Sequence, residues 1–186
     1  MTGLVASRTC GDCTVCCTVL PIDADGFAKS SGVTCGHCVS AGCAIHPDRP
    51  TPCRAFDCGW LQLPMLDDAW RPDRSGILIM ADDDDIPARY TERPGIKLLL
   101  VGERRTSLTL PMLGYVAGLV DGGMPTFIAV PGPPGCFFAK AFLNDRLRAA
   151  VARRDGGEML RTLHALLDIL EAGDFEPVPT GPFNPG

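Results

Sequence analysis

The sequence has little positive charge. Its 186 residues include 17 Lys and Arg against 22 Asp and Glu, which gives a formal net charge of −5 at pH 7. The basic residues also form no long run. Because a protein must neutralise phosphates with a basic surface in order to hold a nucleic acid, we expect no nucleic-acid partner.

Long apolar runs and a secretion signal are also missing from the sequence. The longest apolar stretches lie at 96–101 and 115–120, far short of the roughly 18 residues that a membrane-spanning helix needs. Residues 1–13 lack the basic start and apolar run of a signal peptide. We therefore expect no membrane partner and a cytoplasmic location, where stable disulfides are rare.

The familiar short catalytic motifs are absent as well. The sequence contains no Gly-x-Ser-x-Gly, no P-loop, no His-Glu-x-x-His and no glycine-rich dinucleotide fingerprint. This disfavours a familiar hydrolase or kinase, and it leaves open whether the protein is an enzyme.

Cysteine, by contrast, is abundant near the N-terminus. Nine of the ten cysteines precede residue 60, and Cys-x-x-Cys spacing occurs at Cys10/Cys13, Cys13/Cys16 and Cys35/Cys38. A two-residue spacer lets both sulfurs converge on one metal centre. The repeated spacing favours metal ligation over a redox dithiol system or plain buried cysteines.

Cys16 and Cys17 are direct neighbours in the sequence. Because adjacent side chains usually point apart, one mononuclear site rarely uses both. The pair indicates two adjacent centres, a multinuclear cluster, or one ligand beside a packing cysteine. Eight thiolates would fill two four-ligand centres. Zinc or iron, in a mononuclear, multinuclear or iron–sulfur arrangement, remains open at this point.

The hydrophobic pattern predicts an α+β fold. We expect a cysteine-rich, irregular metal-binding module over 1–65, packed on a small sheet, and an α+β part with two C-terminal helices over 66–186, as separate domains or as one fused domain. The acidic run 82–85 is predicted to be a solvated loop. The expected strands are 75–81, 95–102, 106–110 and 125–130. The expected helices are 111–120, one beginning near 138, and 158–172.

The cysteine-rich segment resembles a known family. "CGDCTVCC" followed by "GCAIHPDRPTPCRAFDC" is similar to the bacterial YkgJ-type family, described as a zinc- or iron-chelating domain. The resemblance covers residues 8–60. Its Cys-x-x-Cys-x-x-Cys-Cys hallmark falls on the cysteines from Cys10 to Cys17. Its second hallmark falls on Cys43, Ile45, Arg49, Pro50, Cys53 and Arg54, and His46 stands where an aromatic residue is usual.

Together, the spacing and the resemblance select eight candidate metal ligands. They are Cys10, Cys13, Cys16, Cys17, Cys38, Cys43, Cys53 and Cys58. Whether Cys35, His37, His46 and Cys136 also ligate is left open. Arg49 and Arg54 flank Cys53 and are candidates to offset the negative charge of the thiolates. Phe56 and Trp60 are expected to pack over the site and exclude water.

These features favour a metal-binding protein that holds zinc or iron. One alternative is an iron–sulfur transferase related to the flagellin lysine methylases, in which a related cysteine cluster resembles an iron–sulfur site. That alternative predicts an open cofactor pocket beside the cluster, lined by the C-terminal strands. The other alternative is an interaction domain with a purely structural zinc, which predicts a shielded centre and an exposed apolar patch elsewhere.

Overall fold

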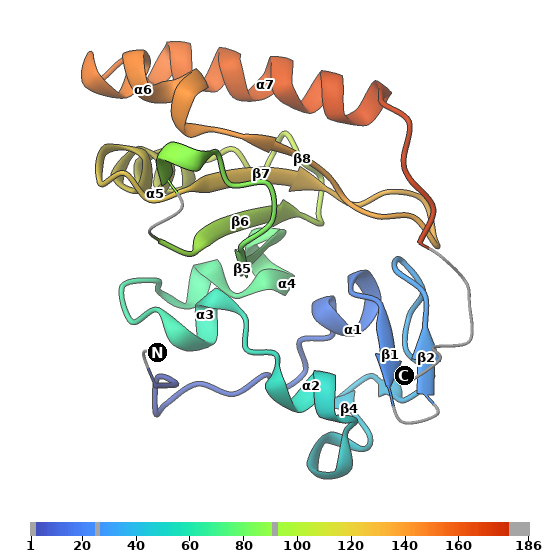
Figure 1. Cartoon of the computed structure of the whole chain (residues 1–186). Helices are drawn as coiled ribbons and strands as arrows, with labels where there is room; N and C mark the ends of the chain where they lie inside the picture. Colours follow the sequence, from blue (N-terminus) through green and yellow to red (C-terminus); the bar gives the residue numbers. More distant parts are fainter. Residues whose placement is uncertain (1–2, 25–26, 91–92, 179–186) are drawn as a thin grey trace.

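A four-stranded sheet lies in the middle of the molecule, whose computed structural model describes residues 3–24, 27–90 and 93–178 (Figure 1). The spatial order of the strands is β5-β6-β7-β8. They are β5 (Ile77–Asp82), β6 (Gly95–Leu100), β7 (Thr126–Val130) and β8 (Ala139–Phe142). β6 and β7 run parallel, and the other two neighbouring pairs are antiparallel. The α+β prediction is confirmed.

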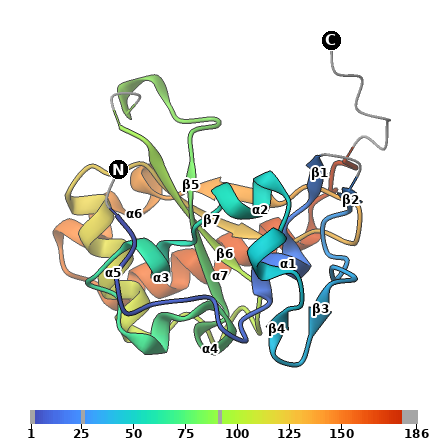
Figure 2. The ribbon, with the colours of Figure 1, turned by 90° about the horizontal axis from the view of Figure 1, so that it is seen from below.

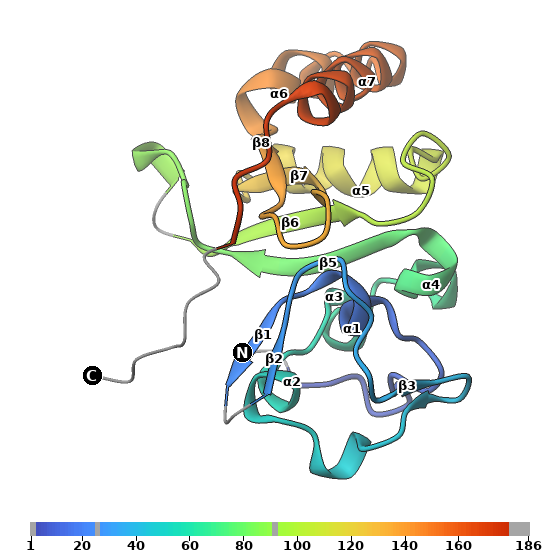
Figure 3. The same ribbon diagram turned by 90° about the vertical axis from the view of Figure 1, so that its right-hand side faces the viewer.

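Three helices form the layers on one side of the sheet (Figures 1 and 3). They are α5 (Leu110–Asp121), α6 (Asn144–Ala152) and α7 (Gly156–Ala172). α5 is the crossover that a parallel pair such as β6 and β7 requires. In α7, the buried residues Met159, Leu163, Leu166 and Leu170 recur at helical spacing. Within the described ranges, no helix combines the length and apolarity needed to cross a lipid bilayer.

The cysteine-rich part lies on the other side of the sheet from α6 and α7, and Figure 2 shows it in front of the strands. It consists of short elements joined by turns. The helical ones are α1 (Val15–Val19), α2 (Thr51–Ala55) and α3 (Gly59–Gln62), and α4 (Pro72–Ser75) follows them just before β5. Two hairpins are formed by β1 (Ile22–Ala24) with β2 (Phe27–Lys29), and by β3 (Cys38–Val39) with β4 (Gly42–Cys43). A single 3-10 turn in this part occupies His46–Asp48, and two more, Asp68–Trp70 and Ala88–Tyr90, lie later in the chain.

One hydrophobic cluster extends through both parts of the chain. It joins Cys58, Trp60 and Leu61 of the cysteine-rich part to the sheet and its helices. α3 packs closely on β5, because a Cβ atom on Gly59 would stand only 2.6 Å from Cγ2 of Ile79. The absence of a side chain at position 59 therefore brings the end of the cysteine-rich segment onto the sheet. The boundary near residue 65 remains a prediction.

Two of the predicted elements were wrong. Residues 106–110 do not form a strand, because the hydroxyls of Thr106 and Ser107 donate to the Glu103 carbonyl and close a turn. The helix predicted to begin near 138 begins at Asn144. The preceding residues form β8, which pairs with β7 through contacts that a local pattern cannot reveal.

Asp82 is buried at the end of β5, although the acidic run was predicted to be solvated. Its carboxylate accepts hydrogen bonds from Lys140 Nζ at 3.0 Å and the Asp84 amide at 3.0 Å, and pairs with Lys97 Nζ at 2.9 Å. Burial alone would raise the pKa of Asp82, but the hydrogen bonds from Lys97 and Lys140 outweigh it and the pKa is lowered. Asp83, by contrast, is exposed.

Replacing Asp82 by Asn should destabilise the protein at neutral pH by about 3 kcal/mol, because two partly buried ammonium groups lose their anion. A lowered carboxyl pKa stabilises the fold above the ordinary Asp value of about 3.9, and the contribution is lost as pH falls through the folded-state value. The wild-type and Asp82→Asn stabilities should therefore converge below about pH 4, as measured by urea unfolding across pH. Asp83→Asn is the control, and equal stability of the two variants at pH 7 would contradict this role.

Candidate functional site

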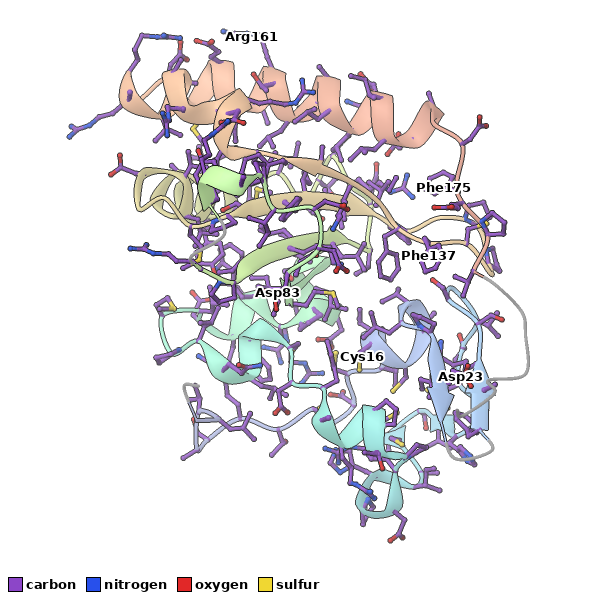
Figure 4. The ribbon with its side chains drawn as sticks, in the orientation of Figure 1. Cys16, Asp23, Asp83, Phe137, Arg161 and Phe175 are labelled. Atoms are coloured by element: carbon purple, nitrogen blue, oxygen red, sulfur yellow. The ribbon has the colours of Figure 1, made fainter. Side chains whose placement is uncertain are left out.

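A cavity of about 400 Å³ lies between the cysteine-rich part and the sheet. Eight free thiols line it. They belong to Cys10, Cys13, Cys16, Cys17, Cys35, Cys43, Cys53 and Cys58. The opposite wall is apolar and includes Leu78 and Met80 of β5 together with Phe138. In Figure 4, Cys16 lies in the space between the two parts, with further sulfur atoms in yellow beside it.

Seven of the eight predicted ligands line this cavity, and Cys38 is the one that does not. Its thiol is hydrogen-bonded to Cys17, which does line the cavity. Cys35 takes its place on the lining, although the Cys-x-x-Cys spacing at 35 and 38 did not distinguish the two. His37 and His46 also line the cavity, whereas Cys136 lies outside the lining and forms a β-bridge with Pro177.

The first cysteine group comprises Cys10, Cys13, Cys16 and Cys58. The Cys13 amide donates to the Cys10 carbonyl at 3.0 Å, which closes the first Cys-x-x-Cys turn. The thiol of Cys58 lies near those of Cys10 and Cys13, whose charge acts on its pKa. Cys10 and Cys16 both pack against the hydrophobic core that contains Cys58. Residues far apart in the sequence are thus brought to one cavity, and Cys10 also lies near enough to Cys17 of the second group for the charge of Cys17 to act on its pKa.

Arg8 holds the first cysteine group together. Its guanidinium donates to the carbonyl oxygens of Trp60, Leu63 (3.0 Å) and Leu66, and it lies 5.1 Å from the centroid of the Trp60 ring. Because Arg8 precedes Cys10 by two residues and Trp60 follows Cys58 by two, these bonds connect the two chain segments that carry the thiols.

The second cysteine group comprises Cys17, Cys35, Cys43 and Cys53. The Cys35 amide donates to the Cys17 carbonyl at 3.0 Å. Cys43 is placed by the β3–β4 hairpin, in which it pairs with Cys38. Cys53 lies in α2, and its thiol is near enough to those of Cys17, Cys35 and Cys43 for their charge to raise its pKa.

The thiol pKa is raised at six of the cysteines, namely Cys10, Cys13, Cys17, Cys38, Cys53 and Cys58. Burial is the largest cause for Cys10, Cys13, Cys53 and Cys58. Burial, followed by the charge of Cys17, raises the pKa of Cys38 to about 11. For Cys17, a hydrogen bond with Cys16 raises the pKa well above the usual range. Such thiols are protonated at neutral pH, so any metal they bound would have to displace these protons.

Arg49 lies at the cavity wall and fixes the loop that carries Cys53. Its Nε donates to the Cys53 carbonyl at 3.0 Å, and its Nη1 donates to the His46 carbonyl at 2.9 Å and contacts the His46 ring. Its charge also acts to lower the pKa of the Cys53 thiol. Arg54 donates instead to the Arg49 carbonyl at 3.0 Å, one step further from the thiols. Phe56 and Trp60 both line the cavity.

Gly42 sets the contact between the β3–β4 hairpin and the first Cys-x-x-Cys turn. Its φ is +114°, and a Cβ atom there would clash with the Gly11 carbonyl oxygen. Gly42→Ala should therefore destabilise the fold by more than the roughly 1–3 kcal/mol of backbone strain alone. Denaturant unfolding of Gly42→Ala measures this loss of stability. Gly36→Ala is the control, because a Cβ atom on Gly36 would meet no atom within 4 Å. Equal losses in the two variants would contradict the close approach.

The thiols surround the cavity and do not meet at one point. Among the described residues, no group of three or more His, Cys, Asp or Glu side chains is arranged so that it could hold a metal ion. The donor set nevertheless has the chemistry of a soft-metal site, because thiolates select zinc, copper(I) and iron–sulfur clusters.

Comparisons with known proteins add no relative. No family model matches the chain, and neither the curated proteins nor the solved structures contain a match.

Proposed function

We propose that this is a metal-binding protein that holds zinc or iron through the thiolates of its cysteine cavity. The observation that carries the proposal is the convergence of eight free thiols, from segments up to 48 residues apart between Cys10 and Cys58, on one cavity. The resemblance of residues 8–60 to the YkgJ-type family points to the same chemistry. A reducing cytoplasm, the compartment expected from the sequence, would keep these thiols available.

The number of thiols favours more than one metal atom, because the eight that line the cavity would fill two four-ligand centres. Zinc–sulfur bonds of about 2.3 Å would require the four sulfurs of a mononuclear site to lie within about 4 Å of one another. The thiols here stand around a cavity of about 400 Å³. In this proposal the chain holds two adjacent centres, the first by the first cysteine group and the second by the second, and the thiols of each group would have to move together on binding. The neighbours Cys16 and Cys17 would then serve different centres.

The kind of metal would determine what the site supplies. Zinc would link the cysteine-rich segments structurally or be stored, whereas iron would provide electron transfer or sensing. The residues of the chain act in the same way in either case. Arg8 and Arg49 hold the segments that carry Cys10, Cys58 and Cys53, and the apolar wall excludes water.

An iron–sulfur transferase is the second candidate, and one observation favours it. The cavity extends beyond the thiols to Leu78, Met80 and Phe138. These residues belong to β5 and to the segment just before β8, so the C-terminal part of the chain provides part of the apolar lining beside the thiols. This wall would contact an organic cofactor or substrate beside the cluster.

Anaerobic purification, followed by metal analysis, sulfide analysis and an absorption spectrum on the same sample, tests the proposal. A brown protein with iron and acid-labile sulfide would support iron–sulfur centres. A colourless protein with one or two zinc ions per chain would support a structural or storage site. A protein that retains no metal, and takes up neither zinc nor iron when reconstituted under reducing conditions, would refute metal binding.

A further inference from the structure

Lys29 is a buried cation at the edge of the second cysteine group. It is the last residue of β2 and is only 8% exposed. Its ammonium donates to three backbone carbonyl oxygens, those of Thr18 at 3.0 Å, Ser30 at 3.1 Å and Val33 at 2.7 Å. Because an ammonium group has three N–H donors, all of them are engaged, and the charge is held in one place.

The carbonyls that hold Lys29 belong to the segments that carry Cys17 and Cys35. Thr18 directly follows Cys17, and Val33 precedes Cys35 by two residues. Two further bonds join the same segments. The Ser31 hydroxyl donates to the Val19 carbonyl at 2.9 Å, and the Cys35 amide donates to the Cys17 carbonyl at 3.0 Å. Lys29 thus joins two segments that carry cysteines of the second group, as Arg8 joins the segments that carry Cys10 and Cys58 of the first.

The charge of Lys29 interacts with nearby thiols. Burial lowers its pKa, and the groups that act in the opposite direction are the thiols of Cys35, Cys17, Cys38 and Cys16. Reciprocally, the charge of Lys29 acts to lower the pKa of Cys17. An ammonium with its hydrogen bonds made to neutral carbonyls retains its full positive charge toward these sulfurs.

We propose that Lys29 is a built-in counter-cation that positions the second cysteine group and stabilises the anionic centre formed there. Four thiolates around one divalent ion carry a net charge of −2, and a fixed ammonium beside them offsets half of it in a medium of low dielectric constant. Lys29 is a positioning residue and does not ligate the metal. The inference rests on the proposed metal-binding function.

The test compares Lys29→Arg, Lys29→Gln and Lys29→Met with the wild-type full chain. Each protein is titrated anaerobically with Co²⁺ and then competed with a chelator, while sulfur-to-cobalt charge-transfer absorption is recorded. Loss of a residue that supports metal ligands typically weakens metal affinity about 10–100-fold. We expect the Gln and Met variants to lose cobalt affinity by this factor at the second cysteine group and not at the first. The Arg variant should keep the wild-type affinity.

Lys140→Met is the matched control. Lys140 is also a partly buried ammonium with several hydrogen bonds, but it lies on β8 and its partners are Asp82, Asp84 and Asp85, none of which belongs to a cysteine-bearing segment. Cobalt affinity in this variant should equal that of the wild type. Wild-type affinity in Lys29→Gln would overturn the role of Lys29, and so would an equal loss in Lys29→Arg and Lys29→Gln. Failure of the wild type and Lys140→Met to bind cobalt at all would instead refute the proposed function.

A measurement on the wild-type chain covers the case in which the neutral variants do not fold. Acetylation of each lysine is followed by mass spectrometry before and after zinc loading. We expect Lys29 to become at least about fivefold less reactive when anionic centres form beside it, because opposite charge favours the ammonium form. Lys140 should be unaffected, and an unchanged rate at Lys29 in the zinc-loaded protein would overturn the proposal.

Discussion

Cys58→Ser is expected to remove the metal of the first cysteine group and leave that of the second, and Cys53→Ser is expected to do the opposite. The two thiols belong to different neighbourhoods, since Cys58 lies near Cys10 and Cys13, whereas Cys53 lies near Cys17, Cys35 and Cys43. A serine hydroxyl is a poor substitute for a thiolate as a ligand of a soft metal. Metal content per chain and the absorption spectrum of each anaerobically purified variant measure the effect.

Cys136→Ser is the control for this pair, because Cys136 lies outside the cavity lining. It should retain the full metal content. Complete metal loss in both Cys53→Ser and Cys58→Ser would contradict two centres and indicate one shared cluster. The adjacent pair extends the test, since Cys16→Ser should resemble Cys58→Ser, and Cys17→Ser should resemble Cys53→Ser.

Removal of the metal is expected to unfold residues 8–60 and to leave the sheet intact. The cysteine-rich part is built from helices and strands of only two to five residues, too short to be stable on their own. In the sheet, by contrast, Leu98, Leu99 and Leu100 are completely buried. For small zinc modules, metal binding supplies about 10–16 kcal/mol of apparent free energy, and that free energy is also folding free energy.

Hydrogen exchange followed by mass spectrometry, with and without a strong chelator, measures this difference. Peptides from 8–60 should lose protection by orders of magnitude on chelation, whereas peptides from β6 and β7 should exchange at their original rate. The same chelator saturated with zinc is the control. Retained protection across 8–60 in metal-free protein would show that the packing of this segment against the sheet stabilises it without coordination.

The gap between local pattern and tertiary placement is clearest around Asp82 and β8. Four consecutive aspartates are typical of a solvated loop, and Asp83 is indeed exposed. The first of them is buried because Lys97 of β6 and Lys140 of β8 supply its counter-charge. Neither lysine is near Asp82 in the sequence, so the pattern of residues 82–85 could not have revealed the pairing.

The sequence by itself determined the elements that depend on local periodicity. The runs that became β5, β6 and β7 are short, apolar and bounded by turn residues, and α7 shows a regular stripe of Leu and Met. The concentration of cysteines and their Cys-x-x-Cys spacing also marked the candidate site, and seven of the eight predicted ligands line the cavity. These features are local because dihedral preferences and side-chain periodicity act over a few residues.

Only the tertiary structure decided which thiols are neighbours. It placed Cys35 but not Cys38 on the cavity lining, gave Cys58 and Cys53 different neighbouring thiols, and brought the apolar side chains of β5 to the same cavity. It also decided that Lys29 and Arg8 join separate segments of the chain. Their hydrogen-bond partners are backbone carbonyl oxygens, which every residue possesses. A backbone carbonyl carries no sequence signal, so such contacts arise only when the chain is folded.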